Sequence, residues 1–267
     1  MHFLTSDGVQ LTYTDEGTGD VVILLTGYSG IKEEWYEQTT YLRNQGFRVI
    51  TLDWRSHGAS TRTTKNLRVM RLAADLNELI QKTAVNNMIM IGHSMGASII
   101  WAYITIFGQK NLKSIITIDE SPKPINDAHW QSGLQGLNWD NFWLMSPHIL
   151  DRPMTICEIP KNLRRRVEKQ RSAYPFNKEI GFELLVDHLM QDWRRVIHQV
   201  QVPQLFILSV DSGLWQGNYR KFCEKENNIG ISVKSIPHAG HLVHMEKPSI
   251  VNAFISDFLF KSMRRSE

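Results

Sequence analysis

The chain has 267 residues, of which 42% are apolar and 21% are charged, and its net charge is +3. This length suits one α/β domain with an insertion, and the apolar content can fill its core. Basic residues are dispersed apart from Arg164–Arg166 and Arg264–Arg265, which argues against nucleic-acid binding. The N-terminal residues lack a signal-peptide pattern, and no apolar run approaches the ~18 residues of a membrane span.

The two cysteines, Cys157 and Cys223, lie far apart in the sequence and match no metal-ligand spacing. Two free thiols suit a reducing compartment better than a disulfide framework does. We therefore expect a cytoplasmic protein without a metal site. No nucleotide-binding glycine pattern is present either, so we expect no cofactor. The sequence does not reveal the oligomeric state.

The first half of the chain alternates short apolar runs with amphipathic segments. The expected strands are Val9–Thr14, Val21–Leu25, Phe47–Leu52, Met88–Ile91 and Leu112–Ile118. The expected helices are Glu33–Asn44, Leu67–Val85 and Ser94–Phe107. Continuous apolar strands separated by helices are typical of a doubly wound, mostly parallel sheet with helices on both faces.

The alternation stops after Pro122, and strands return only near the end of the chain. The later elements are expected to be helices at Pro160–Ser172 and Lys178–Val200, strands at Gln204–Ser209 and Ile231–Ile236, and a helix at Pro248–Met263. We therefore assign residues 1–121 and 201–267 to an α/β core. Residues 122–200 would form a helical cap inserted after the strand that ends at Asp119. Ligands bind at the carboxyl ends of strands in such sheets, so the cap would cover that edge.

Gly92-His93-Ser94-Met95-Gly96 matches the G-x-S-x-G pattern between an expected strand and an expected helix. In so tight a turn, the flanking glycines avoid a clash, and the serine hydroxyl stands clear of the sheet. The Ser94 and Met95 amides begin a helix, where the positive end of its dipole would stabilise an oxyanion. Ser94 is therefore the expected nucleophile. His93 should point away from it.

A serine hydroxyl needs a base to remove its proton, and His241 is the best placed of ten histidines. It follows the last expected strand and precedes the last helix, so it lies at the same sheet edge as Ser94. The preceding Gly240 lets the loop aim the ring. His238 and His244 are the rivals, and we expect them to make loop and cap contacts.

Three segments of the sequence resemble motifs of the α/β-hydrolase superfamily, and they occur in the order that this superfamily has, along nearly the whole chain. They are the turn at 92–96, the segment Asp53-Trp54-Arg55-Ser56-His57-Gly58-Ala59-Ser60, and Gly240-His241. The resemblance implies that Thr26-Gly27-Tyr28-Ser29-Gly30 supplies a second oxyanion donor, the Tyr28 amide. The family usually has histidine at the position of Thr26 and glycine at the position of Ser56. Asp53, Arg55 and His57 are expected to be structural.

The acid that orients the histidine has two candidates. The usual family position falls on Ser212, and Asp211 lies one residue earlier. The haloalkane dehalogenases and the cofactor-free heterocycle dioxygenases of this superfamily instead carry the acid at the end of the next strand, which follows the helix that begins at the nucleophile. That position holds Asp119 here. We favour Asp119 and keep Asp211 as the alternative, although aspartates after strands are also common turn residues.

The expected reaction is hydrolysis of a carboxylic ester or a related acyl compound through a Ser94 acyl-enzyme. The alternative is a cofactor-free dioxygenase or a C–C bond hydrolase that uses the His/Asp pair on an aromatic substrate. The alternative is based on a resemblance to the cofactor-free dioxygenases in three places: Asp53-Trp54-Arg55, the acid position Asp119, and Pro122-Lys123-Pro124. A serine nucleophile argues against dehalogenase chemistry, which needs a carboxylate. The substrate is a small acyl or aromatic molecule in either case.

The substrate preference is expected to lie in the cap. Its candidate pocket residues are Trp130, Trp139, Phe142 and Trp143. Each of these aromatic side chains could equally belong to the core of the cap.

Overall fold

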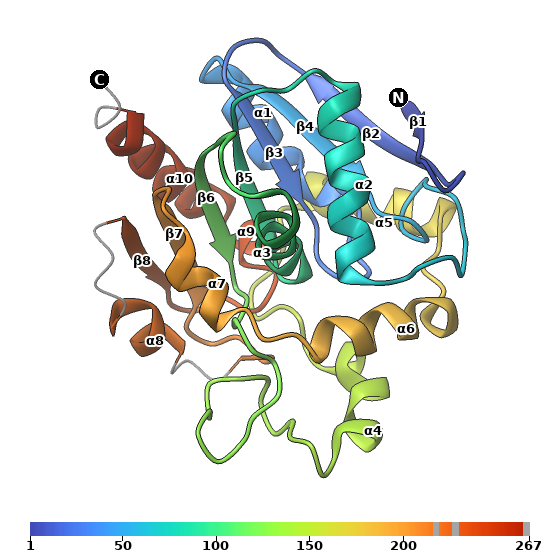
Figure 1. The fold of residues 1–267 in the computed structure, drawn as a ribbon, viewed down its shortest axis with the longest axis vertical. Helices are drawn as coiled ribbons and strands as arrows, with labels where there is room; N and C mark the ends of the chain where they lie inside the picture. Colours follow the sequence, from blue (N-terminus) through green and yellow to red (C-terminus); the bar gives the residue numbers. More distant parts are fainter. Residues whose placement is uncertain (216–218, 226–229, 264–267) are drawn as a thin grey trace.

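The computed structural model describes residues 1–215, 219–225 and 230–263, and within these ranges one sheet of eight strands forms the centre of the fold (Figure 1). The spatial order is β1-β2-β4-β3-β5-β6-β7-β8. The strands are β1 His2–Leu4, β2 Gln10–Glu16, β3 Val21–Leu25, β4 Arg48–Asp53, β5 Met88–His93, β6 Leu112–Ile118, β7 Gln204–Ser209 and β8 Ile231–Ile236. From β4 to β8 all neighbours pair in parallel, whereas β2 is antiparallel to β1 and β4. This confirms the predicted mostly parallel sheet.

Side chains of the central strands alternate between two apolar layers. Ile23 and Leu25 of β3 belong to one core cluster, whereas Val22 and Leu24 belong to the other. Successive residues of a strand point to opposite faces, so a strand buried on both faces must be apolar throughout. The uninterrupted run Val21–Leu25 meets this demand.

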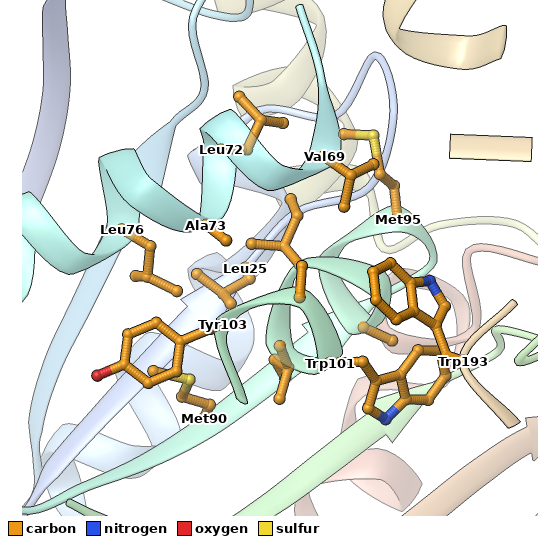
Figure 2. Packing of buried hydrophobic residues seen from close by; sticks show 14 of the residues in the cluster. Leu25, Val69, Leu72, Ala73, Leu76, Met90, Met95, Trp101, Tyr103 and Trp193 are labelled. Carbon is orange, nitrogen blue, oxygen red and sulfur yellow. The ribbon is translucent and has the colours of Figure 1, made fainter. Parts of the chain in front are cut away.

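Helices cover both faces of the sheet. The helices of the core are η1 Lys32–Trp35, α1 Tyr36–Asn44, α2 Val69–Lys82, α3 Met95–Phe107, α8 Tyr219–Lys225, α9 Val243–Glu246 and α10 Pro248–Met263. Leu76 of α2 and Trp101 of α3 pack over Leu25 and Met90 (Figure 2). Residues of α1 and α10 contribute to the cluster on the opposite face.

Residues 119–203, all of which are described, contain helices but no strand of the main sheet. These helices are α4 Phe142–Met145, η2 Ser146–Asp151, α5 Lys161–Ala173, α6 Lys178–Leu189 and α7 Arg194–Gln199. Figure 1 shows α4 and α6 beyond the carboxyl end of β6. Among the described residues, no helix is long and apolar enough to cross a membrane.

The predicted single helix Lys178–Val200 is wrong, because the helix is interrupted between Leu189, where α6 ends, and Arg194, where α7 begins. The Trp193 amide donates to the Pro122 carbonyl at 2.8 Å, which ties the break to the start of the helical segment. The Asp192 carboxylate accepts from the Arg194 amide at the start of α7. Side-chain capping of this kind competes with helix continuation.

A buried ion pair connects the loop after β4 to α2. The Arg55 guanidinium donates to both oxygens of Asp75, each at 2.7 Å, and both side chains are fully buried. Arg55 also contacts Asp7, and the hydrogen bonds it donates hold the pKa of Asp7 well below its usual range. Arg55 therefore anchors three separate segments, in agreement with its expected structural role.

Asp75→Asn should lower the free energy of unfolding by about 3 kcal/mol, because the buried guanidinium of Arg55 loses its fully buried partner and keeps only the partly exposed Asp7. The matched control is Asp20→Asn, which removes an ion pair with Lys113 that is more than one-third exposed. The control should cost less than about 1 kcal/mol. Urea denaturation measures both, and equal losses in the two variants would contradict the prediction.

Candidate functional site

Ser94 lies in a strained turn between β5 and α3. Its φ of 52° and ψ of −131° lie in a region that side chains other than glycine rarely adopt. The Ser94 amide donates to the Ile118 carbonyl at 2.9 Å, and the Ser94 carbonyl accepts from Ala97 at 2.7 Å. The turn is thus bound to β6 on one side and to α3 on the other. Because the Ser94 amide already donates to the Ile118 carbonyl, it is not available to donate to an oxyanion. The expectation that it would do so is wrong.

Three glycines around the turn leave no room for a larger residue. A Cβ on Gly92 would lie 2.5 Å from the Gly96 carbonyl carbon, and one on Gly96 would lie 2.8 Å from the Leu25 carbonyl carbon. A Cβ on Gly27 would lie 2.8 Å from the Ser94 Cβ. The glycines at positions 92 and 96 therefore meet the steric demand that their pattern predicted. Gly27 also brings the loop after β3 against the serine.

The structure brings His241 into contact with Asp119. The distance from His241 Nδ1 to Asp119 Oδ2 is 2.8 Å, and both side chains are buried. A carboxylate accepts hydrogen bonds, so Nδ1 carries the proton and Nε2 remains available as a base. In the described part of the chain, the Ser94 hydroxyl makes no hydrogen bond to His241. Such contacts often tighten only when the substrate binds.

Asp119 receives further support from two serines near the end of β7. The Ser209 amide donates to its Oδ1 at 2.9 Å, and the Ser212 hydroxyl donates to its Oδ2 at 2.7 Å. The Trp215 indole also donates to the Asp119 carbonyl at 2.8 Å. Ser212, which occupies the usual position of the acid, thus contacts the carboxylate on the neighbouring strand.

The alternative acid and the rival bases lie elsewhere. The exposed Asp211 accepts from the His238 amide at 2.7 Å, rather than from His241. His244 packs between Trp35 and His93, with ring centroids 4.6 and 4.3 Å away, and burial lowers its pKa to about 3. Neither His238 nor His244 lines the cavity that contains Ser94.

His93 supports the loop that carries His241. Its Nε2 lies 2.9 Å from the His241 carbonyl, which can only accept, so Nε2 carries the proton. The two rings are also in contact, with centroids 4.6 Å apart and planes tilted by 45°. Burial holds the pKa of His93 well below its usual value, so this ring stays neutral. It can position His241 without competing for a proton.

The loop Thr26–Gly30 is braced from the segment that follows β4. The Trp54 indole donates to the Thr26 carbonyl at 3.0 Å, and the Ser29 amide donates to His57 Nε2 at 3.1 Å. His57 Nδ1 in turn donates to the Arg55 carbonyl at 2.9 Å. Burial lowers the pKa of His57 to about 4, so it stays neutral and keeps Nε2 as an acceptor. This bracing explains the structural role expected of His57.

Ser94, His241, Gly27 and Tyr28 line one cavity of about 400 Å³. Its apolar walls come largely from the helical segment after β6 and from the residues after β7: Leu134, Ile149, Leu150, Met154, Leu185, Leu189, Leu214 and Trp215. At the wall, Arg171 of α5 pairs with the buried Glu34 at 2.6 Å. The cavity can therefore hold a small, mainly apolar molecule.

The four aromatic residues expected to bind substrate do not line this cavity, and that expectation is corrected. Trp139 and Trp143 are 56% and 66% exposed, whereas Phe142 is buried in the core. Trp130 packs against Phe222 and donates from its indole to the Lys123 carbonyl. Residue type alone could not separate core, surface and pocket within a segment that lacks regular periodicity.

Sequence reasoning missed the cavity residues of α6 and those after β7. Leu185, His188 and Leu189 follow the i, i+3, i+4 spacing that places side chains on one helix face. This spacing was available as a signal. Trp215 gave none, because its place depends on the bond to the Asp119 carbonyl.

Comparison with known proteins identifies the family. The sequence model of the family described as "alpha/beta hydrolase fold" matches residues 20–147. A Synechocystis sp. protein provisionally named a non-heme chloroperoxidase is 30% identical, over 94% of this chain and 95% of its own length.

Two solved structures share the fold. The esterase EaEST from Exiguobacterium antarcticum has a TM-score of 0.84 at 18% identity, and 97% of this chain and 98% of that chain are covered. A bromoperoxidase from Bacillus anthracis has a TM-score of 0.82 at 18% identity, and 97% and 99% are covered. The family model and the 30%-identical Synechocystis sp. relative show that the chain belongs to the α/β-hydrolase superfamily, and the two structures share its fold.

Proposed function

We propose that this protein is a serine hydrolase that cleaves a carboxylic ester or a related acyl compound. The observation that carries the proposal is the 2.8 Å contact between His241 and the buried Asp119, in a loop that lines the same cavity as the elbow residue Ser94. A histidine held in one tautomer beside a strained serine is the arrangement that nucleophilic acyl transfer requires.

In the proposed mechanism, Ser94 Oγ attacks the carbonyl carbon while His241 Nε2 accepts the hydroxyl proton. Asp119 stabilises the imidazolium that forms. The amides of Tyr28 and Met95 donate to the oxyanion. The C–O bond to the leaving alcohol then breaks as His241 returns the proton. Water then attacks the carbonyl carbon of the acyl-enzyme while His241 Nε2 accepts its proton. The C–O bond to Ser94 breaks as His241 returns that proton to Ser94 Oγ, so that a carboxylic acid leaves and Ser94 is regenerated.

We also propose that residues 122–200 act as the cap of this site. They supply six of the eight apolar residues of the cavity wall named above: Leu134, Ile149, Leu150, Met154, Leu185 and Leu189. Apolar walls strengthen the electrostatic interactions of the oxyanion because they reduce the amount of water around it. The cavity volume of about 400 Å³ favours a short acyl group over a long one. The esterase that shares the fold is consistent with this substrate class.

Ser94→Ala should abolish hydrolysis of p-nitrophenyl acetate and butyrate, with kcat falling by about 10³-fold or more, because the nucleophile is lost. The wild-type protein should show a burst of p-nitrophenol and should be labelled by a fluorophosphonate, whereas the variant should show neither. Ser98→Ala, on the same helix but outside the cavity, is the matched control and should keep activity.

A wild-type protein that neither turns over these esters nor reacts with the fluorophosphonate would contradict the proposal. Oxygen uptake with a hydroxyquinolone by the same preparation would then favour the alternative dioxygenase chemistry of the His/Asp pair.

Asp119→Asn should lower kcat by about 10³- to 10⁴-fold, because the amide no longer holds the productive imidazole tautomer. Asp211→Asn should change kcat by less than about threefold, since that carboxylate contacts the His238 amide instead. Steady-state kinetics on p-nitrophenyl butyrate compares the two variants. If the larger loss falls on Asp211→Asn, the assignment of the acid is wrong.

A further inference from the structure

Glu120 and His188 form a second polar pair beside the proposed catalytic residues. Glu120 directly follows Asp119 and is 1% exposed. His188 comes from α6, is 3% exposed and forms part of the cavity wall. The distance from His188 Nε2 to Glu120 Oε1 is 3.6 Å, which is longer than a hydrogen bond. The proposed mechanism assigns no role to either residue.

Both side chains have buried atoms for which the described residues provide no well-aligned hydrogen-bond partner, although the Ser94 hydroxyl faces Glu120. These atoms are Glu120 Oε1, Glu120 Oε2 and His188 Nδ1. A buried polar atom without a partner costs about 1–3 kcal/mol, and most such atoms in native proteins are paired. His188 lies at the cavity wall with Glu120 behind it, which suggests that a polar group of a ligand completes the hydrogen bonding of His188.

Burial disfavours the charged form of both side chains. Burial and the adjacent Asp119 carboxylate raise the pKa of Glu120 well above its usual value, and a hydrogen bond from the Ser94 hydroxyl opposes this only in part. Burial, with a smaller contribution from His241, lowers the pKa of His188 to about 3, so this ring is uncharged at neutral pH. Tyr219 also faces Glu120 and Asp119, and burial raises its pKa. His188 thus offers one neutral donor and one neutral acceptor.

We propose that His188, with Glu120 behind it, is a subsite that hydrogen-bonds an uncharged oxygen, a hydroxyl or carbonyl, on the substrate. This inference rests on the proposed ester hydrolysis. It adds a preference for esters that carry a further hydroxyl or carbonyl oxygen. Leu185 and Leu189 lie beside His188 on the same face of α6, so one oxygen substituent would be distinguished from a methylene there. An ionised carboxylate at this subsite would be disfavoured, because Asp119 places a negative charge nearby and the two cations of the cavity wall, Arg171 and Lys178, already pair with Glu34 and Asp151. Glu120 acts here as a positioning residue for His188.

Equilibrium binding to the Ser94→Ala protein tests this subsite without any turnover. Calorimetry would compare methyl butyrate with methyl 2-hydroxybutyrate and methyl 3-hydroxybutyrate, and ethyl butyrate with 2-hydroxyethyl butyrate. At least one hydroxylated ester should bind about tenfold more tightly than its plain partner, since a site with unpaired polar groups discriminates against a ligand that lacks the oxygen. A monomethyl succinate should bind more weakly than the best hydroxylated ester.

Substitutions in the same Ser94→Ala background identify the residues responsible. His188→Leu should bring the ratio of affinities to within about twofold, and His188→Gln should retain part of it. Glu120→Gln, which mimics a neutral carboxylic acid, should preserve the ratio, whereas Glu120→Leu should reduce it. The matched control is Glu183→Gln, at an exposed position of α6 that pairs with Arg68. The control should leave the ratio unchanged.

Two results would overturn the inference: equal affinity for every hydroxylated and plain pair, or a preference that survives His188→Leu. The first result is obtained with Ser94→Ala alone, so it remains decisive even if the protein that also carries His188→Leu does not fold. Failure of the proposed function is distinguishable, because it would appear as absent fluorophosphonate labelling of wild-type protein, whereas the affinity ratio is measured without the nucleophile.

Discussion

The contact between Asp119 and His241 is the interaction on which the site depends. Asp119 follows β6 with a φ of 46°, a conformation that costs a non-glycine residue of order 1–3 kcal/mol. Its carboxylate is fully buried, and three donors from Ser209, Ser212 and His241 stabilise it there. This single side chain joins the ends of β6 and β7 to the loop after β8. The sheet thereby determines where the imidazole lies.

The remaining interactions hold the partners of this contact in place. The neutral His93 bonds the His241 carbonyl, and His57 with Trp54 braces the loop that carries Gly27 and Tyr28. Each acts through a fixed tautomer or a single donor, without carrying charge into the cavity. The strain at Ser94 and Asp119 is maintained because these braces and the sheet around them are rigid. In the described part of the chain, His188 lies at the cavity wall with Glu120 behind it, and this framework provides no well-aligned partner for His188 Nδ1.

The sequence predicted those features that depend on local chemistry. The strand Val21–Leu25 could be recognised because a strand buried on both faces must be continuously apolar. The glycines at 92 and 96 could be recognised because the turn excludes a Cβ. The contact between Asp119 and His241 followed from the rule that the strand ends of a parallel sheet share one edge.

The cavity wall could not be predicted in the same way, because its residues are brought together only by tertiary packing. Phe142 and Trp143 are adjacent in the sequence, yet one is buried in the core and the other lies at the surface. Trp215 reaches the cavity through a bond to a main-chain carbonyl, for which no sequence pattern exists. The break between α6 and α7 likewise depends on the contact between Trp193 and Pro122.

A crystal structure of the protein inactivated by an alkyl fluorophosphonate tests the central claim most directly. We expect a covalent bond from Ser94 Oγ to phosphorus and a phosphonyl oxygen about 3 Å from the amides of Tyr28 and Met95. The contact between His241 and Asp119 should remain intact. A phosphonyl group on any other residue, or a His241 ring bonded to Asp211 in the adduct, would contradict it.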